Sequence, residues 1–240
     1  MPQSLFKYLT AEFANDMVTK GSIQIGTLSY YRDIEDQARA DRNEGKLSKS
    51  TTFKEEKTIS NKEEFERDLP FLKGSNINNV RGTVKMPLGS GFSTQEDIPD
   101  SFIYCTSEKH SKDLLAKFKA DVCVEIFNVQ LFLDILSDEL LRRKMTYPFT
   151  ASGRKIEYIG HDHDHNIKLS GNWLKDNIFS EESEFRFCLI PVYHKDGKQI
   201  EPVRHPDKSL TFPTDHDPLD LKPFVIRRKE ICHCCRIIPT

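Results

Sequence analysis

The order of helical and strand-like patterns along the chain limits its possible folds more than any other feature. Helical spacing of apolar residues follows Thr10 and Ser111 and continues from Val129 to Lys144, whereas short strand patterns outnumber helices later in the chain. A protein built from parallel βαβ units would alternate the two patterns regularly. The sequence therefore predicts an α+β fold with a mixed, mainly antiparallel sheet and a few packed helices.

The expected strands are short, and residues of helix-capping types bound the first helices. Thr10 and Ser111 are expected N-caps, and Gly21 tolerates the left-handed conformation that ends many helices. Runs rich in β-branched and aromatic residues, or with alternating polarity, predict strands. These runs are Phe6–Leu9, Ser22–Tyr31, Ser101–Thr106, Val122–Ile126, Arg154–Ile159, Glu184–His194 and Pro223–Ile226.

One long segment differs from the rest in composition. From about residue 47 to residue 91 the chain is rich in Lys, Glu, Ser, Thr and Asn and poor in apolar residues. Because such a segment buries little apolar surface, we expect a peripheral or mobile excursion in which some weak strands could hide. The full length of 240 residues, 37% of them hydrophobic, is enough for one sizeable core. We therefore expect a single domain over residues 1–240, with a polar excursion at about 47–91.

Charge, cysteine content and hydropathy indicate where the protein acts. With 35 basic and 37 acidic residues, the net charge of -2 gives no global field that recruits nucleic acid, although a local patch could still do so. Cys105, Cys123 and Cys188 lie in strongly apolar segments, as is typical of reduced, buried thiols. No signal peptide opens the sequence, and no run reaches the roughly 18 apolar residues of a membrane span. We expect a cytoplasmic protein that does not enter a membrane.

The first candidate site is the segment Glu182, Ser183, Glu184, Phe185, Arg186 at the entry to a strand. In a strand the side chains alternate, so Glu182, Glu184, Arg186 and Cys188 would share one face while Phe185, Phe187 and Leu189 pack into the core. Adjacent carboxylates can divide catalytic work, because repulsion raises the pKa of one while a neighbouring Arg keeps the other ionised. The alternative is a solvated strand edge with an ordinary ion pair.

Two further candidates follow strands. Tyr31 and Arg32 could form a nucleotide pocket, in which the guanidinium binds a pyrophosphate and the aromatic ring stacks on a base or a nicotinamide. They could equally belong to a charged turn. Thr106 and Ser107, which follow Cys105, offer hydroxyl groups that could bind a ligand, hold the glutamates in place or serve as turn and capping residues.

Two clusters contain metal-ligand residue types. One is an extended segment with His161, His163 and His165, and the other is the C-terminal group of Cys232, Cys234 and Cys235. A His-rich polar loop is more often simply exposed, and the cysteines at the end of a last strand could simply pack. The sequence leaves open whether either cluster binds a metal, and we predict no metal site.

Three segments resemble a widespread group of poorly characterised bacterial proteins. They are FKYLTAEFANDMVTKGSIQIGTLSYYRDIEDQARADRNEG, FIYCTSE and FSEESEFRF. These proteins begin with a similar K-Y strand, a helix and a strand that ends in Y-R-D. The resemblance implies little about chemistry.

A more distant likeness is to the arginine-type ADP-ribosyltransferases. That family carries, in chain order, an Arg on an early strand, an S-T-S strand and E-x-E before a late strand; Arg32, Cys105 to Ser107, and Glu182 with Glu184 stand in this order here. The resemblance implies an ADP-ribosyltransferase-like fold and NAD as substrate. It implies that Arg32 positions the NAD and that the segment from Cys105 to Ser107 supports the binding pocket. It implies that Glu184 stabilises the ribose cation and that Glu182 orients the acceptor. Cys105 replaces the first Ser of the family's motif.

The leading hypothesis is an NAD-dependent ADP-ribosyltransferase or NAD glycohydrolase, such as a bacterial toxin or phage-defence effector. Tyr31, Arg32, Thr106, Ser107 and Arg186 are its expected NAD-binding residues, and its expected partner is a macromolecular acceptor, either protein or nucleic acid.

Two other hypotheses remain open. A metal-dependent nuclease or hydrolase would use Glu35, Asp36, Glu182 and Glu184 with the histidine-rich loop. A non-catalytic module would use Arg32, Arg39 and Arg186 to bind a phosphate-bearing ligand or a nucleic-acid end.

Overall fold

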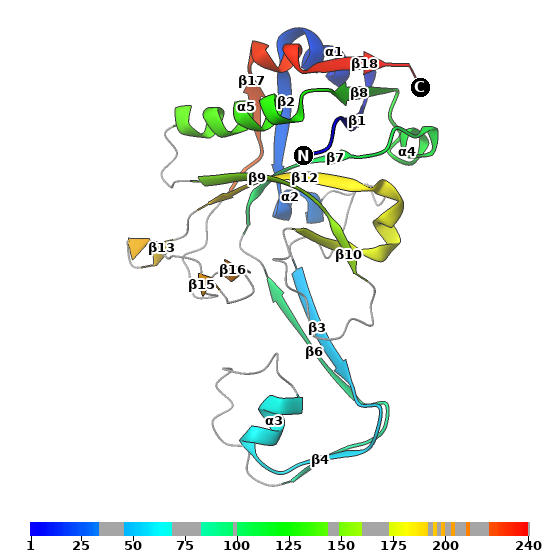
Figure 1. Cartoon of the computed structure of the whole chain (residues 1–240), viewed down its shortest axis with the longest axis vertical. Coiled ribbons are helices and arrows are strands. Elements are labelled where there is room, and N and C mark those ends of the chain that lie inside the picture. The colour runs from blue at the N-terminus through cyan, green and yellow to red at the C-terminus, as the bar shows by residue number, and fades with distance from the viewer. Residues whose placement is uncertain are drawn as a thin grey trace.

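The structure is a computed structural model that describes residues 1–33, 46–68, 83–97, 100–143, 149–159, 173–191 and 221–239, together with the short strands at 194–195, 198–199, 203–204 and 210–211. Figure 1 shows a body that contains both chain ends and an elongated arm that leads away from it. We use the name "arm" for residues 46–97.

The body is built on an eight-stranded sheet. Its strands are β1 (Leu5–Leu9), β2 (Ser22–Thr27), β7 (Phe102–Ser107), β8 (Val122–Ile126), β9 (Phe149–Lys155), β12 (Glu184–Pro191), β17 (Phe224–Arg227) and β18 (Cys235–Ile238). They run in the order β17-β2-β7-β1-β8-β18, and β12 lies between β7 and β9. Every ladder in this sheet is antiparallel.

The remaining ladders pair two strands each. One is parallel, between β10 (Glu157–Ile159) and β11 (Leu174–Asp176). The others are antiparallel and join β3 (Lys46–Thr52) to β6 (Gly91–Asp97), β4 (Lys57–Ile59) to β5 (Val84–Met86), β13 (His194–Lys195) to β14 (Lys198–Gln199), and β15 (Val203–Arg204) to β16 (Leu210–Thr211). The predicted α+β class with a mixed, mainly antiparallel arrangement is confirmed.

Most helices in the described ranges are short. They are α1 (Ala11–Lys20), α2 (Leu28–Asp33), α3 (Lys62–Asp68), α4 (Lys112–Lys117) and α5 (Val129–Arg142), with 3₁₀ turns η3 (Asn177–Glu182) and η4 (Lys229–His233). Thr10 and Ser111 are N-caps, as predicted, because their hydroxyl oxygens accept from Phe13 N and Asp113 N. Gly21 ends α1 at φ 64. No helix in the described ranges is long and apolar enough to cross a membrane.

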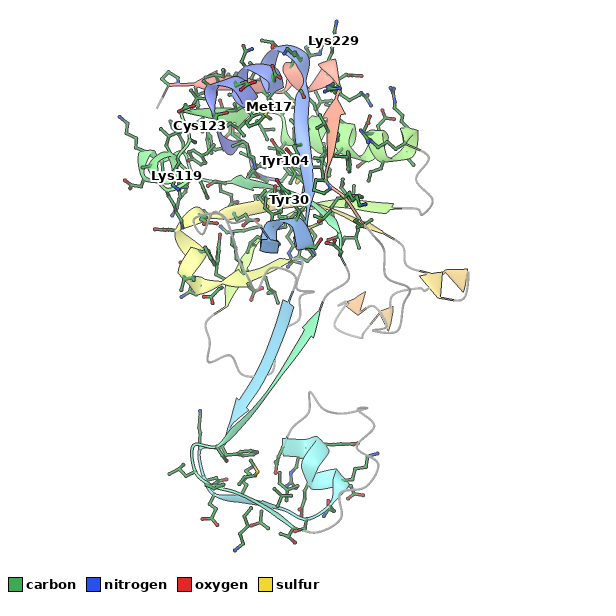
Figure 2. The ribbon with its side chains drawn as sticks, turned by 180° about the vertical axis from the view of Figure 1, so that it is seen from behind. Met17, Tyr30, Tyr104, Lys119, Cys123 and Lys229 are labelled. Atoms are coloured by element: carbon green, nitrogen blue, oxygen red, sulfur yellow. The ribbon has the colours of Figure 1, made fainter. Side chains whose placement is uncertain are left out.

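The main core lies between the sheet and helices α1 and α5. Met17 of α1 and Phe132 of α5 are fully buried in it. The ring of Phe132 packs against Tyr104 and Phe187, with centroid distances of 5.4 and 5.2 Å. The Tyr104 hydroxyl donates to Met17 Sδ at 3.6 Å, and Figure 2 shows both residues inside the body. Each such side chain contributes about 1.5 to 3 kcal/mol through burial.

The strand predicted from Ser22 to Tyr31 is wrong in its second half. It ends at Thr27, and Leu28 begins α2. The hydroxyl of Thr27 accepts from Tyr30 N at 3.0 Å, and the carboxylate of Asp100 accepts from Ser29 N at 3.1 Å. These two acceptors satisfy the free N–H groups of a new helix, which local strand propensity does not reveal.

Two later predictions also need correction. The expected strand from Arg154 to Ile159 covers parts of two strands. The amide of Ile156, just after β9, still donates to Glu184 O of β12 at 3.0 Å, and β10 then pairs with β11 instead of β12. The strand expected to reach His194 ends at Pro191, whose missing N–H cannot continue a ladder, and His194 belongs to β13. The Lys144 end of the third predicted helix lies outside the described residues; α5 ends at Arg142.

The arm corresponds to the polar excursion of the sequence. Strands β3 and β6 form a ribbon from Lys46 opposite Asp97 to Thr52 opposite Gly91. Helix α3 and strand β4 lie at the far end of this ribbon from the body (Figure 1). Phe53, Ile59 and Met86 are buried there, apart from the core clusters of the body. The arm therefore has strands and buried apolar residues of its own.

Candidate functional site

The backbone bends sharply where β12 begins. Glu182 is the last residue of η3, Ser183 adopts a left-handed conformation at φ 45, and β12 starts at Glu184. The prediction that Glu182 shares a strand face with Glu184 is therefore wrong, because the left-handed residue breaks the strand alternation. From Glu184 onward the predicted alternation holds, since Phe185 and Phe187 enter the main core.

The other face of β12 is buried as well. Cys188 packs into an inner cluster with Leu28, Ile103, Ile156 and Trp173, and Tyr31 lies against that cluster. Arg186 has no exposed surface and Glu184 is 3% exposed. The acidic and basic side chains of this face are therefore enclosed, and the alternative of a solvated strand edge does not describe them.

The two hydroxyl residues after Cys105 hold the backbone of the glutamate segment. Strand β7 lies beside β12, with Ser107 opposite Glu184 and Thr106 opposite Phe185. Thr106 Oγ1 donates to Phe185 O at 2.7 Å, and Ser107 Oγ donates to Glu182 O at 2.6 Å. Ser107 Oγ also accepts from Lys109 N at 2.9 Å. Two of the roles left open in the sequence are therefore present: the hydroxyls hold the glutamate segment, and that of Ser107 also bonds the turn after β7.

Three basic side chains surround the two carboxylates. Arg186 Nε donates to Glu184 Oε1 at 2.8 Å. Lys175 Nζ of β11 donates to Glu184 Oε2 at 3.0 Å and to Glu182 Oε2 at 2.8 Å. Lys117 Nζ of α4 lies 3.0 Å from Glu182 Oε1. We call these five residues the charged cluster.

The charged cluster keeps Glu184 ionised. Burial acts to raise the pKa of its carboxyl group, but the charges of Arg186 and Lys175 and hydrogen bonds from Arg186 and Cys105 outweigh burial. The pKa of Glu184 is therefore lowered well below its usual range. An ionised carboxylate in a fixed position can stabilise a positive charge that develops nearby.

Two tyrosines adjoin this carboxylate. Tyr158 OH accepts from Glu184 N at 2.6 Å, and burial raises the pKa of its phenol to about 12 despite that bond. Burial is also the largest cause of the raised pKa of Tyr31, to which the nearby charge of Glu184 contributes. Both phenols therefore stay protonated at neutral pH.

One side of the charged cluster approaches solvent. The side chain of Lys117 is 23% exposed, and it also contacts Glu181, whose side chain is 65% exposed. The ring of Phe179 lies under both lysines, with Lys175 Nζ at 4.7 Å and Lys117 Nζ at 5.6 Å from its centroid. Lys117 is therefore the most exposed member of the charged cluster.

Several predicted residues are placed differently or lie outside the described part. Tyr31 and Arg32 belong to helix α2 and not to a strand, and the side chain of Arg32 is outside the description. Glu35, Asp36, Arg39, His161, His163 and His165 also lie outside the described residues.

The C-terminal cysteines are free thiols, and Cys234 and Cys235 are buried. Cys234 Sγ and Cys235 Sγ lie 3.8 Å apart. Across the described ranges no group of three or more His, Cys, Asp or Glu residues could hold a metal ion.

The sequence did not reveal Lys117 or Lys175. Lys117 lies in a helix and Lys175 in a three-residue strand, both far from the glutamates along the chain. No local spacing links them to Glu182, because the sheet and η3 bring them together.

Comparison with protein-family models, with curated proteins and with solved structures gives no match.

Proposed function

We propose that the protein is an NAD-dependent ADP-ribosyltransferase or NAD glycohydrolase. The observation that carries the proposal is the Glu184 carboxylate, which is enclosed, ionised and fixed at the start of β12. It is supported by the position of Thr106 and Ser107 on the neighbouring strand, where their hydroxyls hold the glutamate segment.

The proposed reaction breaks the bond between nicotinamide and the ribose of NAD. Nicotinamide leaves with the bonding electrons, and positive charge develops on the ribose ring. Glu184 stabilises that charge as it forms. An acceptor oxygen or nitrogen, or water, then bonds to the ribose carbon and loses its proton to solvent, and Glu182 orients this acceptor.

The proposed NAD-binding residues divide into two groups. Tyr31 and Arg32 would contact NAD directly, through stacking and through the pyrophosphate. The contacts of Arg186, Thr106 and Ser107 support an indirect role, since each bonds the glutamate segment itself. These three residues would hold the carboxylates in place for bound NAD.

We further propose that the protein acts in the bacterial cytoplasm as a toxin or phage-defence effector. The acceptor would be a protein or a nucleic acid, and water would serve in the glycohydrolase reaction. All six cysteines are free thiols, which suits a reducing compartment.

The test is nicotinamide release and transfer of labelled ADP-ribose by purified protein, with and without cell extract. Glu184→Gln should lower release at least about 10²-fold, because the amide cannot neutralise the ribose cation. Glu181→Gln is the matched control, since Glu181 lies in the same segment but points to solvent and contacts Lys117 only at the cluster's edge. It should keep the wild-type rate.

The outcomes separate the hypotheses. Absence of release by the wild-type protein under all these conditions would overturn the proposal. Hydrolysis of nucleic acid that a chelator abolishes would instead support the metal-dependent hydrolase. Ligand-induced stabilisation without turnover would support the binding module. Circular dichroism of Glu184→Gln shows whether a loss of activity occurs in a folded protein.

A further inference from the structure

Lys175 contacts both carboxylates of the glutamate segment through one nitrogen. Its Nζ lies 2.8 Å from Glu182 Oε2 and 3.0 Å from Glu184 Oε2. The lysine side chain is 10% exposed, and the two carboxylate side chains are 6% and 4% exposed. In such surroundings the attraction between opposite charges is weakly screened.

Groups from several elements face Glu184. Those that the structure describes are Arg186 on the same strand, Lys175 on β11, Cys105 on β7, Tyr31 on α2, Tyr158 on β10 and Glu182 at the end of η3. Arg186 Nε contacts Glu184 Oε1 at 2.8 Å, and Lys175 Nζ contacts Glu184 Oε2 at 3.0 Å. Lys175 thus holds Glu184 from a second element, at the Oε2 oxygen.

We propose that Lys175 is a positioning residue of the candidate site, which holds Glu182 and Glu184 together and aims Glu184 at the ribose. The inference rests on the proposed NAD chemistry. Lys175 acts on the reaction through Glu184 and touches no reacting atom.

The physical reason is the repulsion between the two carboxylates. Ser183 bends the chain so that both acidic side chains reach the same nitrogen. Without that nitrogen, two enclosed carboxylates would lie near each other, and Glu184 would take up a proton or turn away. Either change removes the ionised oxygen from its place, and displacement by about 1 Å lowers a rate roughly 10²-fold.

The experiment compares Lys175→Met, Lys175→Gln and Lys175→Arg with Lys117→Met. It measures kcat and KM for nicotinamide release from NAD from about pH 4 to about pH 9. Lys117→Met is the matched comparison, because Lys117 bonds Glu182 and Glu181 while its described contacts do not include Glu184.

The two neutral variants at position 175 should lose about 10²-fold in kcat with KM changed by less than about threefold. The acid limb of the wild-type pH profile of kcat should lie below the measured range, because the pKa of Glu184 is lowered. In the neutral variants this limb should move up into the measured range, because Glu184 loses a cationic neighbour. Lys175→Arg should keep the limb at its wild-type position, and so should Lys117→Met. Lys175→Gln keeps a donor for one carboxylate, so it serves if Lys175→Met does not fold.

Each outcome decides the matter. Release by the wild type together with unchanged kcat and acid limb in a folded neutral variant would overturn the inference and leave the proposed function intact. Equal shifts in Lys175→Met and Lys117→Met would also overturn it, since they would indicate a general loosening. If neither neutral variant folds, an upward shift of the limb in Lys175→Arg overturns it and an unmoved limb supports it. No release by the wild type would refute the proposed function itself.

Discussion

At the scale of single residues, the charged cluster is distinguished by the burial of its central ion pair. Arg186 is wholly buried, and its partner Glu184 is almost so. Removal of one partner from a buried ion pair leaves the other charge uncompensated, which destabilises a protein by about 3 to 5 kcal/mol. The cluster therefore links the stability of the body to the proposed site.

The first prediction concerns pH and stability. Since the folded-state pKa of Glu184 is lowered, its contribution to stability is present above the unfolded-state pKa of about 4.3 and is lost as pH falls toward the folded value. Glu184→Gln should be less stable than the wild type by about 3 to 5 kcal/mol near neutral pH, and the gap should narrow below about pH 4. Urea denaturation at several pH values measures both quantities.

Glu181→Gln is the control for that series. Its side chain is 65% exposed, so the unfolding midpoint should stay close to that of the wild type at every pH. A gap between Glu184→Gln and the wild type that stays constant down to acid pH would contradict the assigned ionisation.

At the scale of elements, the close contact between α1 and the start of η4 depends on one glycine. Gly21 ends α1 at φ 64, and a Cβ atom there would lie 1.8 Å from Arg228 O. Arg228 N in turn donates to Gly21 O at 3.0 Å. The end of the first helix and the last part of the chain therefore meet backbone to backbone.

Two substitutions of Gly21 separate the effect of its left-handed conformation from that of its close contact with Arg228. Gly21→Ala should destabilise the body by more than the roughly 1 to 2 kcal/mol of a left-handed alanine, because the backbone of Arg228 must also move. Asparagine tolerates the left-handed conformation better but carries the same Cβ. Gly21→Asn should therefore lose about as much stability as Gly21→Ala in urea denaturation. A near-wild-type Asn variant would show that conformation, and not the contact, decides.

Local patterns predicted many elements but not how distant elements meet. Thr10, Gly21 and Ser111 mark helix ends through their own side chains or φ angle, so the sequence was sufficient there. Helix α2 was missed because the carboxylate that helps to start it, Asp100, is far away in the chain.

The same distinction applies to the candidate site. Glu182, Glu184 and Arg186 were found because they are neighbours in sequence, and strand alternation placed Arg186 correctly. The bend at Ser183 was not predicted, since a serine with positive φ has no clear sequence signal. Lys117 and Lys175 reach the site only through tertiary packing.

At the scale of the whole molecule, the arm is connected to the body through one pair of strands. Lys46 and Asp97 are partners in the ribbon, so their Cα atoms lie about 5 Å apart. The buried residues of the arm, Phe53, Ile59 and Met86, belong to none of the body's described core clusters. The body should therefore fold without the arm.

A variant without the arm should test whether the body folds independently. Replacement of residues 46–97 by a Gly/Ser linker of about three residues should leave a cooperative unfolding transition, with a melting temperature within about 3 °C of the body's transition in the full chain. Differential scanning calorimetry measures both the cooperativity of the transition and its melting temperature. An excised protein without a cooperative transition would show that the arm supports the body through contacts of its own.

The ribbon also affects how quickly the body can form. Leu28 N bonds Ser101 O at 3.1 Å and β2 pairs with β7, although the whole arm separates these partners along the chain. Closing so long a loop as a flexible chain carries an entropic penalty that slows folding. Once β3 and β6 have paired, Lys46 and Asp97 are neighbours, so the loop that the arm forms between β2 and β7 is already closed for most of its length. The ladder between β3 and β6 thereby turns a distant encounter into a nearly local one, and the arm need not delay nucleation of the sheet.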